Sequence, residues 1–130
     1  MPVVIEKHPA LNLTIFKATG SVPFSEQRQV LTSFYEGSPT SNVIWDFTRA
    51  TDVTISNSEL RAIIQYTKEH AARRQAGRTA LVVNTKLQYG LARMTSTFAE
   101  IEQTPWPIMV FEQLDEALTW IAERDPTGTE

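Results

Sequence analysis

The sequence contains no cysteine, and this absence excludes disulfide bonds, thiolate zinc sites and cysteine nucleophiles together. Its five glycines are scattered, so there is no glycine-rich phosphate-binding loop, and no G-x-S-x-G nucleophile elbow occurs. The two histidines, His8 and His70, are far apart, and neither has a neighbour at metal-ligand spacing. We therefore predict no catalytic residue, no metal site and no cofactor, and the preferred interpretation is a protein that is not an enzyme.

Long apolar runs are also missing. No stretch approaches the roughly 20 apolar residues that span a bilayer, and the first ten residues lack the basic and apolar regions of a signal peptide. With 12 Lys+Arg against 15 Asp+Glu in 130 residues, the chain has no basic excess that would attract nucleic acid or an anionic membrane. We therefore expect a cytoplasmic protein that binds neither nucleic acid nor membrane.

Hydrophobic patterning predicts five strands and four helices. Runs at residues 3–8 and 11–20 are strand-like, and the short Pro9-Ala10 connection between them suits an antiparallel pair. The remaining strands are expected at residues 42–47, 78–85 and 107–111, and a polar connection at residues 48–55 follows the first of these. The helices are expected at residues 25–36, at about 56–76, from about Leu87 to before Pro105, and from Leu114 to Ile121.

The predicted order is therefore ββαβαβαβα, which is typical of the α/β class. Strands that alternate with helices indicate a mostly parallel five-stranded sheet built by right-handed crossovers, with the first strand as an antiparallel edge. Residues 1–124 are expected to form a single domain, and residues 125–130 a frayed C-terminal tail.

Each of the four predicted helices has an apolar face expected to lie against the core. Ser25 is the expected N-cap of the first helix, whose core side chains are Phe24, Val30, Leu31 and Phe34. In the third helix, spacings of four and three place Leu87, Leu91, Met94, Phe98 and Ile101 on one apolar stripe, with Arg93 on the opposite side. Gly90 costs this helix roughly 1 kcal/mol relative to alanine, so we expect it to lie close to another backbone or beneath a small ligand.

Polar residues follow the predicted parallel strands, at the edge of the sheet where ligands gather in open α/β folds. Asp46, Thr48 and Arg49 follow the third strand, and Thr85 and Lys86 follow the fourth. Asp46 and Lys86 can form a charged pair at this edge, and the preferred interpretation of these residues is structural, as a salt bridge or as solvated loop ends. The same residues, together with part of the next helix, form the candidate ligand or partner surface: Asp46, Thr48, Arg49, Thr85, Lys86, Tyr89, Gly90 and Arg93.

The second helix begins with Ser56-Asn57-Ser58-Glu59. Ser56 and Glu59 fit a capping box, in which serine is the N-cap and glutamate the third helical residue. The alternative is a phosphorylation site, because the free N–H groups and the dipole of a helix N-terminus favour a phosphate. The capping box is the preferred interpretation.

Several strings of the second half resemble the STAS superfamily, and within it the small bacterial SpoIIAA-like proteins: TALVV, YGLARM, and IMVF followed by DEALTWI. The resemblance implies a sheet with its strands in sequential order and its helices mainly on one face. It also implies a regulatory or interaction module that is not an enzyme. Anti-sigma-factor antagonists of this type are switched by phosphorylation of a serine in a D-S-S-G-like turn. That turn is absent from WDFTRATDVTISNSEL, which leaves Ser56 and Ser58 as the candidate phosphosites.

Two functions follow as hypotheses. The first is a noncatalytic module that binds a regulatory protein, and that can also pair as a homodimer. An exposed apolar patch that includes Trp106 or Trp120 would favour it. The second is a small-ligand-binding protein or an unrecognised enzyme, with a crevice at the carboxyl ends of the strands.

Overall fold

The computed structural model describes residues 3–53, 55–74, 77–104 and 106–123, so the predicted tail and the expected domain end at residue 124 lie outside it. Within this part of the chain, the strands are β1 (Val3–His8), β2 (Leu13–Ser21), β3 (Asn42–Asp52), β4 (Thr79–Val82) and β5 (Ile108–Phe111). The helices are α1 (Phe24–Glu36), α2 (Asn57–Glu69), α3 (Ala71–Arg74), α4 (Lys86–Glu102) and α5 (Leu114–Ala122), and a 3₁₀ turn (Pro9–Leu11) joins β1 to β2.

The five strands form one sheet in the order β1-β2-β3-β4-β5. Strand β1 runs antiparallel to β2, and every later pair is parallel. The mostly parallel sheet, its antiparallel first strand and the predicted alternation of strands and helices are confirmed. The difference lies in α3, which makes five helices where four were predicted. The expected second helix divides because α2 ends at His70, whose N–H bonds the carbonyls of Tyr66 and Thr67.

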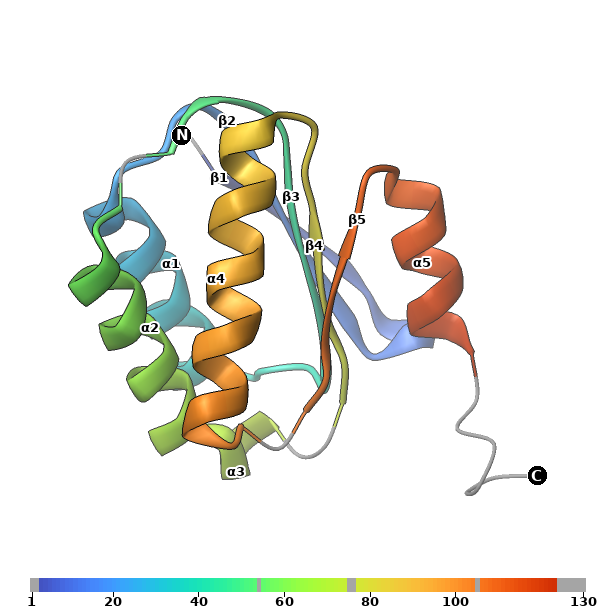
Figure 1. Cartoon of the computed structure of the whole chain (residues 1–130). Coiled ribbons are helices and arrows are strands. Elements are labelled where there is room, and N and C mark those ends of the chain that lie inside the picture. Colours follow the sequence, from blue (N-terminus) through green and yellow to red (C-terminus); the bar gives the residue numbers. More distant parts are fainter. Residues whose placement is uncertain (1–2, 54, 75–76, 105, 124–130) are drawn as a thin grey trace.

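Helices cover the two faces of the sheet unequally, as Figure 1 shows. Helices α1, α2 and α4 lie on one face, over a core that includes Phe16 and Trp45. Helix α5 lies alone on the other face, over a core that includes Ile15 and Ile44. Consecutive residues of β2 and β3 therefore serve opposite cores, which explains why these strands are apolar on both faces.

The N-cap of helix α1 lies two residues earlier than predicted. Pro23, in an extended conformation, is its N-cap, and Ser25 lies inside the first turn, so the prediction of a Ser25 cap is wrong. Pro23 has no side-chain acceptor, and its backbone carbonyl accepts hydrogen bonds from the N–H groups of Glu26 and Gln27. Val30, Leu31 and Phe34 are buried as predicted, whereas Phe24 is half-buried.

The predicted apolar stripe of α4 is wrong in phase. Gln88, Ala92 and Ala99 are buried, whereas Leu87 is 69 % exposed and Ile101 is 60 % exposed. The small alanine side chains allow the helix to lie close over the sheet. Leu91, Met94 and Phe98 are half-buried and flank the buried side of the helix. The side of α4 that faces the sheet is therefore the one with the small side chains, and not the one on which its largest apolar residues are spaced.

Strand β3 is longer than predicted. Residues 48–52, expected in a polar connection, continue the strand beside the end of β2. Lys17 lies opposite Asp46 and Thr19 opposite Arg49, so β3 has one extra residue at this point. Such a bulge bends a strand and re-aims its side chains. It lies directly beside the predicted site residues.

Candidate functional site

Two amide side chains join the end of β3 to the start of α4. The Nε2 group of Gln88 donates to the carbonyl oxygens of Phe47 at 3.0 Å and Ala50 at 3.2 Å. The Nδ2 group of Asn84 donates to the carbonyl oxygen of Thr48 at 2.8 Å, and its backbone N–H donates to Gln88 Oε1 at 2.9 Å. The irregular backbone of β3 thus obtains its hydrogen bonds from the segment that follows β4. Gln88 was not predicted from the sequence, because a single polar residue outside the apolar stripe gives no signal that its side chain is buried.

Asp46 forms a local turn instead of the predicted ion pair. Its Oδ1 atom accepts hydrogen bonds from Thr48 Oγ1 at 2.7 Å and from Thr48 N at 3.0 Å. Lys86 is exposed and forms no ion pair with any described residue, so the predicted Asp46–Lys86 pair is wrong. The hydroxyl and N–H of Thr48 satisfy the carboxylate two residues away, which removes the need for a distant cation. Arg49 is exposed on the bulge.

The remaining predicted residues lie on the first turns of α4. Thr85 is the N-cap of this helix, and its hydroxyl accepts from the N–H of Gln88 at 3.1 Å. The guanidinium of Arg93 lies 5.9 Å from the centre of the exposed Tyr89 ring. An added Cβ on Gly90 would meet no atom within 4 Å, so the expected close approach of another backbone is wrong. Tyr89, Gly90 and Arg93 are thus an accessible part of the surface.

The start of α2 has the predicted capping box. Ser56 Oγ accepts from the N–H of Glu59 at 3.2 Å, and Glu59 Oε1 accepts from the N–H of Ser56 at 2.9 Å. The hydroxyl groups of Ser56 and Ser58 are 3.2 Å apart, and both residues are exposed. The structural role of Ser56 is confirmed, and its hydroxyl is accessible to solvent.

A cavity of about 110 Å³ lies between the sheet and the helices α1, α2 and α4. Its walls are mainly apolar and include Trp45, Ile64 and Leu81, while Ala92 and Thr95 line it from α4. Small side chains on the sheet-facing side of a helix leave such spaces because neighbouring atoms relax only partly. Ala92 and Thr95 were the residues in the sequence that could have indicated this cavity. They were overlooked because the prediction placed a different side of α4 against the core.

Arg74 lies at the wall of this cavity and is only 3 % exposed. Its Nε group donates to Ser41 O at 2.8 Å, and its Nη2 group donates to Arg78 O at 2.9 Å and to Thr79 Oγ1 at 2.6 Å. Burial lowers the pKa of Arg74, and burial raises the pKa of the neighbouring Tyr35. No described carboxylate forms an ion pair with Arg74, so its hydrogen bonds to described residues go to neutral oxygens.

Comparison with known proteins supports the architecture. No family model and no curated protein matches the sequence. The chain is similar to a solved structure of an uncharacterised protein of the DUF3478 family from Shewanella loihica, described as having a SpoIIAA-like fold. The two chains are 20 % identical, with 92 % of each chain covered and a TM-score of 0.60. It is also similar to the anti-sigma factor antagonist SpoIIAA in its unphosphorylated form, at 17 % identity, with 94 % of this chain and 99 % of the other covered and a TM-score of 0.59.

The chain has a SpoIIAA-like fold. The sequential strand order and the gathering of most helices on one face agree with what the sequence resemblance implies.

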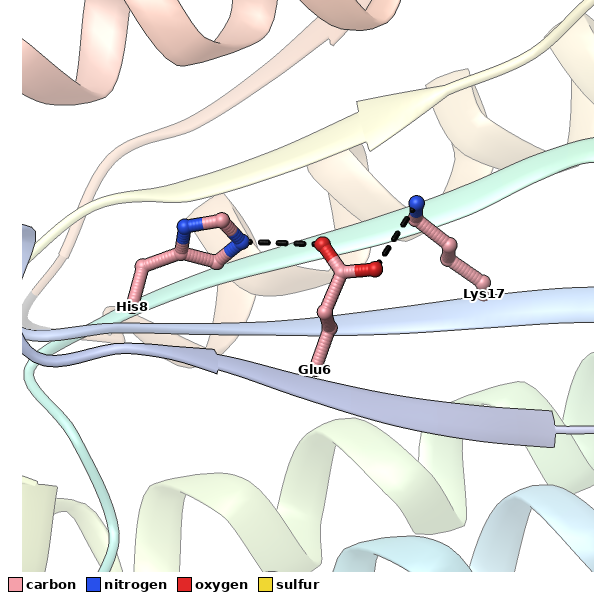
Figure 2. Close-up of polar contacts among 3 residues, drawn as sticks. All are labelled: Glu6, His8 and Lys17. Atoms are coloured by element: carbon pink, nitrogen blue, oxygen red, sulfur yellow. Dashed lines mark hydrogen bonds and ion pairs between the residues drawn. The ribbon is translucent and has the colours of Figure 1, made fainter.

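The other face of this SpoIIAA-like sheet carries a second polar cluster, shown in Figure 2. Glu6 Oε1 lies 2.9 Å from His8 Nε2, and Glu6 Oε2 lies 3.0 Å from Lys17 Nζ. The hydrogen bond with His8 and then that with Lys17 lower the pKa of the Glu6 carboxyl. All three side chains are partly exposed, so the cluster is a surface ion-pair network on β1 and β2.

Among the described residues, no three His, Cys, Asp or Glu side chains lie together as metal ligands would. None of their helices has both the length and the apolar character needed to cross a bilayer.

Proposed function

We propose that this SpoIIAA-like chain is a noncatalytic regulatory module that binds a regulatory protein. The surface proposed for this role comprises the exposed start of α2 and the first turns of α4. Both helices follow parallel strands and therefore begin at the same end of the sheet (Figure 1).

One observation supports this proposal above the others. The polar groups at the strand ends hold each other in place, with Asp46 bound to Thr48, and Asn84 and Gln88 bound to β3. What remains accessible is a surface with an aromatic ring and a cation, Tyr89 and Arg93, side by side. Tyrosine and arginine are the residue types enriched in protein interfaces.

Phosphorylation of Ser56 would act as a switch on this surface. The Glu59 carboxylate accepts a hydrogen bond from the Ser56 N–H at 2.9 Å, so a phosphate on Ser56 Oγ would lie close to a like charge. The repulsion would open the capping box and rearrange the first turn of α2, while the free helix N–H groups would bind the phosphate. Ser58 is the second candidate, because its hydroxyl lies 3.2 Å from that of Ser56.

The test is affinity capture of the tagged protein from lysate of its source cells, with mass spectrometry of the bound proteins. We expect a regulator to be captured specifically, and Ser56→Asp and Arg93→Glu each to reduce the captured amount. Ser33→Asp and Arg28→Glu are matched controls, because both residues are exposed on α1. The proposal is wrong if no protein is captured above background, or if both surface variants capture as much as the wild type.

The cavity favours binding of a small apolar ligand as a second candidate function. It lies between the helices and the sheet, and its lining includes Trp45 and Phe47 of β3 and Val83, which follows β4. Its volume of about 110 Å³ approaches that of engineered apolar cavities that bind benzene. Titration with benzene, followed by amide NMR shifts, should perturb residues such as Leu81 and Ile64 in the wild type but not in Ala92→Leu, which fills the space. Unperturbed shifts in the wild type would exclude this function.

A further inference from the structure

The two edges of the sheet are protected very differently. Strand β1 carries charged or titratable side chains at Glu6, Lys7 and His8, and charges on an edge strand discourage pairing with another chain. Strand β5, of sequence IMVF, has no charged residue, and Met109 is 44 % exposed. Figure 1 shows β5 at the open edge of the sheet, between α4 and α5. The β5 edge lacks the charged protection that the β1 edge has.

The backbone of β5 has hydrogen-bonding groups directed away from the sheet. Thr79 N donates to Pro107 O at 3.0 Å, and Val83 N donates to Phe111 O at 2.9 Å. In a parallel ladder, the residues that bond the neighbouring strand alternate with residues whose N–H and C=O point to the other side. Pro107, Met109 and Phe111 therefore face β4, and the N–H and C=O groups of Ile108 and Val110 point outward.

A groove of about 310 Å³ runs beside this edge, between the end of α4 and the start of β5. Ala99 lines it from α4, Gln103 lines it from the C-cap of that helix, and Ile108 lines it from β5. Glu100 is the one charged side chain in its described lining. A strand added to β5 would place alternate side chains over this groove, as expected for peptide recognition by strand addition.

Charge identifies the kind of segment that fits. Residues 100–104 and 106–123 contain six acidic residues and neither lysine nor arginine. Two of these acids are paired, Glu102 with Lys68 and Glu123 with Arg78. The other four are exposed and form no ion pair with a described residue: Glu100, Glu112, Asp115 and Glu116. A second copy of the chain would bring like charges together, whereas a basic segment would meet opposite ones.

We propose that the free edge of β5 accepts an extended, basic segment of a partner protein as a sixth strand. The outward N–H and C=O groups of Ile108 and Val110 provide the strand hydrogen bonds, the groove accepts alternate apolar side chains, and the four exposed acids attract the lysine or arginine residues. This surface extends the proposed interaction role and is separate from the start of α2.

The probe is a short synthetic peptide in which valine alternates with lysine, titrated into the full chain and followed by amide NMR. We expect shifts and slowed hydrogen exchange at Ile108 and Val110, and affinity that falls with added salt. A peptide with alternate N-methylated bonds cannot pair as a strand and should not bind. A peptide with glutamate in place of lysine should bind at least about tenfold more weakly.

Protein variants separate backbone pairing from charge. Val110→Pro removes an outward N–H without removing a bond to β4, and proline is tolerated at such edge positions. It should abolish peptide binding. Glu112→Lys should weaken it about tenfold, whereas Glu36→Lys on α1 should leave it unchanged. If Val110→Pro does not fold, the N-methylated peptide on wild-type protein makes the same distinction.

Three outcomes would overturn the proposal: no binding of the basic peptide, equal binding of the N-methylated peptide, or a dimer formed through β5 in the absence of peptide. Ser56→Asp and Arg93→Glu should leave peptide binding unchanged. Failure at β5 is therefore distinguishable from failure of the surface formed by α2 and α4.

Discussion

The guanidinium carbon of Arg74 lies 4.2 Å from the centre of the Trp106 ring, and both side chains are buried. Arg74 also donates hydrogen bonds to Ser41, Arg78 and Thr79. One side chain therefore joins α3, the start of β3, the start of β4 and the segment before β5. Trp106, considered above as part of an exposed patch, belongs instead to the interior, and Trp120 is half-buried against Phe111.

Replacement of this arginine should destabilise the fold. Arg74→Met removes the donors to Ser41 O and Thr79 Oγ1 and one of the two donors to Arg78 O, and we expect a loss of about 2–4 kcal/mol in the free energy of unfolding. Urea unfolding should show a lower midpoint with an unchanged slope. Arg73→Met is the matched control, because Arg73 is exposed and bonds only the carbonyl of Gly37 at 3.1 Å. A loss in the control equal to that of Arg74→Met would contradict this role.

Gly77 should not tolerate a side chain. An added Cβ would lie 1.9 Å from the carbonyl oxygen of Ser41, which belongs to the backbone and cannot turn aside. We expect Gly77→Ala to cost about 3 kcal/mol or more, or to prevent folding. Thermal unfolding followed by circular dichroism measures the effect. A melting temperature within error of the wild type would show that the close approach is wrong.

Gly90 should behave in the opposite way. Its position is helical, exposed and open, so Gly90→Ala should stabilise the chain by about 0.5–1 kcal/mol through the lower backbone entropy of the unfolded state. The same unfolding measurement applies. If the glycine serves a partner that lies over it, Gly90→Ala will be more stable yet will capture less protein from lysate.

The cap of α2 allows structure to be separated from regulation. Ser56→Ala removes the hydroxyl that accepts from Glu59 N and should cost about 1 kcal/mol, whereas Ser56→Asp keeps an N-cap acceptor and should cost less. Ser58→Ala is the control, because Ser58 does not cap the helix. Equal losses for Ser56→Ala and Ser58→Ala would argue against the capping role.

The network around Glu6 should make a small contribution that depends on pH. The folded-state pKa of Glu6 is lowered from 4.5, so the contribution is present above the unfolded pKa and is lost as pH falls through the folded pKa. The carboxylate side chain is 43 % exposed, so solvent screening limits the effect to less than about 1 kcal/mol. The stability difference between wild type and Glu6→Gln should therefore shrink on acidification. Glu36→Gln, at an exposed site without an ion pair, should show no such trend.

The sheet could be predicted because its signals are local. The near-continuous apolar runs around Ile44 and Leu81 indicate buried parallel strands, and the helices between them leave one simple topology. The phase of α4 could not be predicted in this way. Its largest apolar residues share a stripe, but the fit of Ala92 and Ala99 against the sheet determines which side is buried.

The bonds of the candidate site residues could not be predicted from the sequence. Asp46 lies inside β3, because the strand continues to Asp52, and it bonds Thr48, whereas Lys86 forms no ion pair with a described residue. The buried hydrogen-bonding role of Arg74 could not be predicted from the sequence, because its partners Ser41 and Thr79 belong to separate segments that come together only in the folded chain. Contacts of that kind leave no periodic pattern in a sequence.

The strand order has a consequence for synthesis on the ribosome. Each strand pairs with its neighbour in sequence, so pairing can proceed as the chain emerges. The core on the α1, α2 and α4 face is made of buried residues from Val3 to Ala92, whereas the core on the other face needs Ala117 and Ile121 of α5. A nascent chain whose α5 is still inside the ribosome therefore exposes Ile15 and Ile44 to water. We expect a chaperone to bind the chain at that stage.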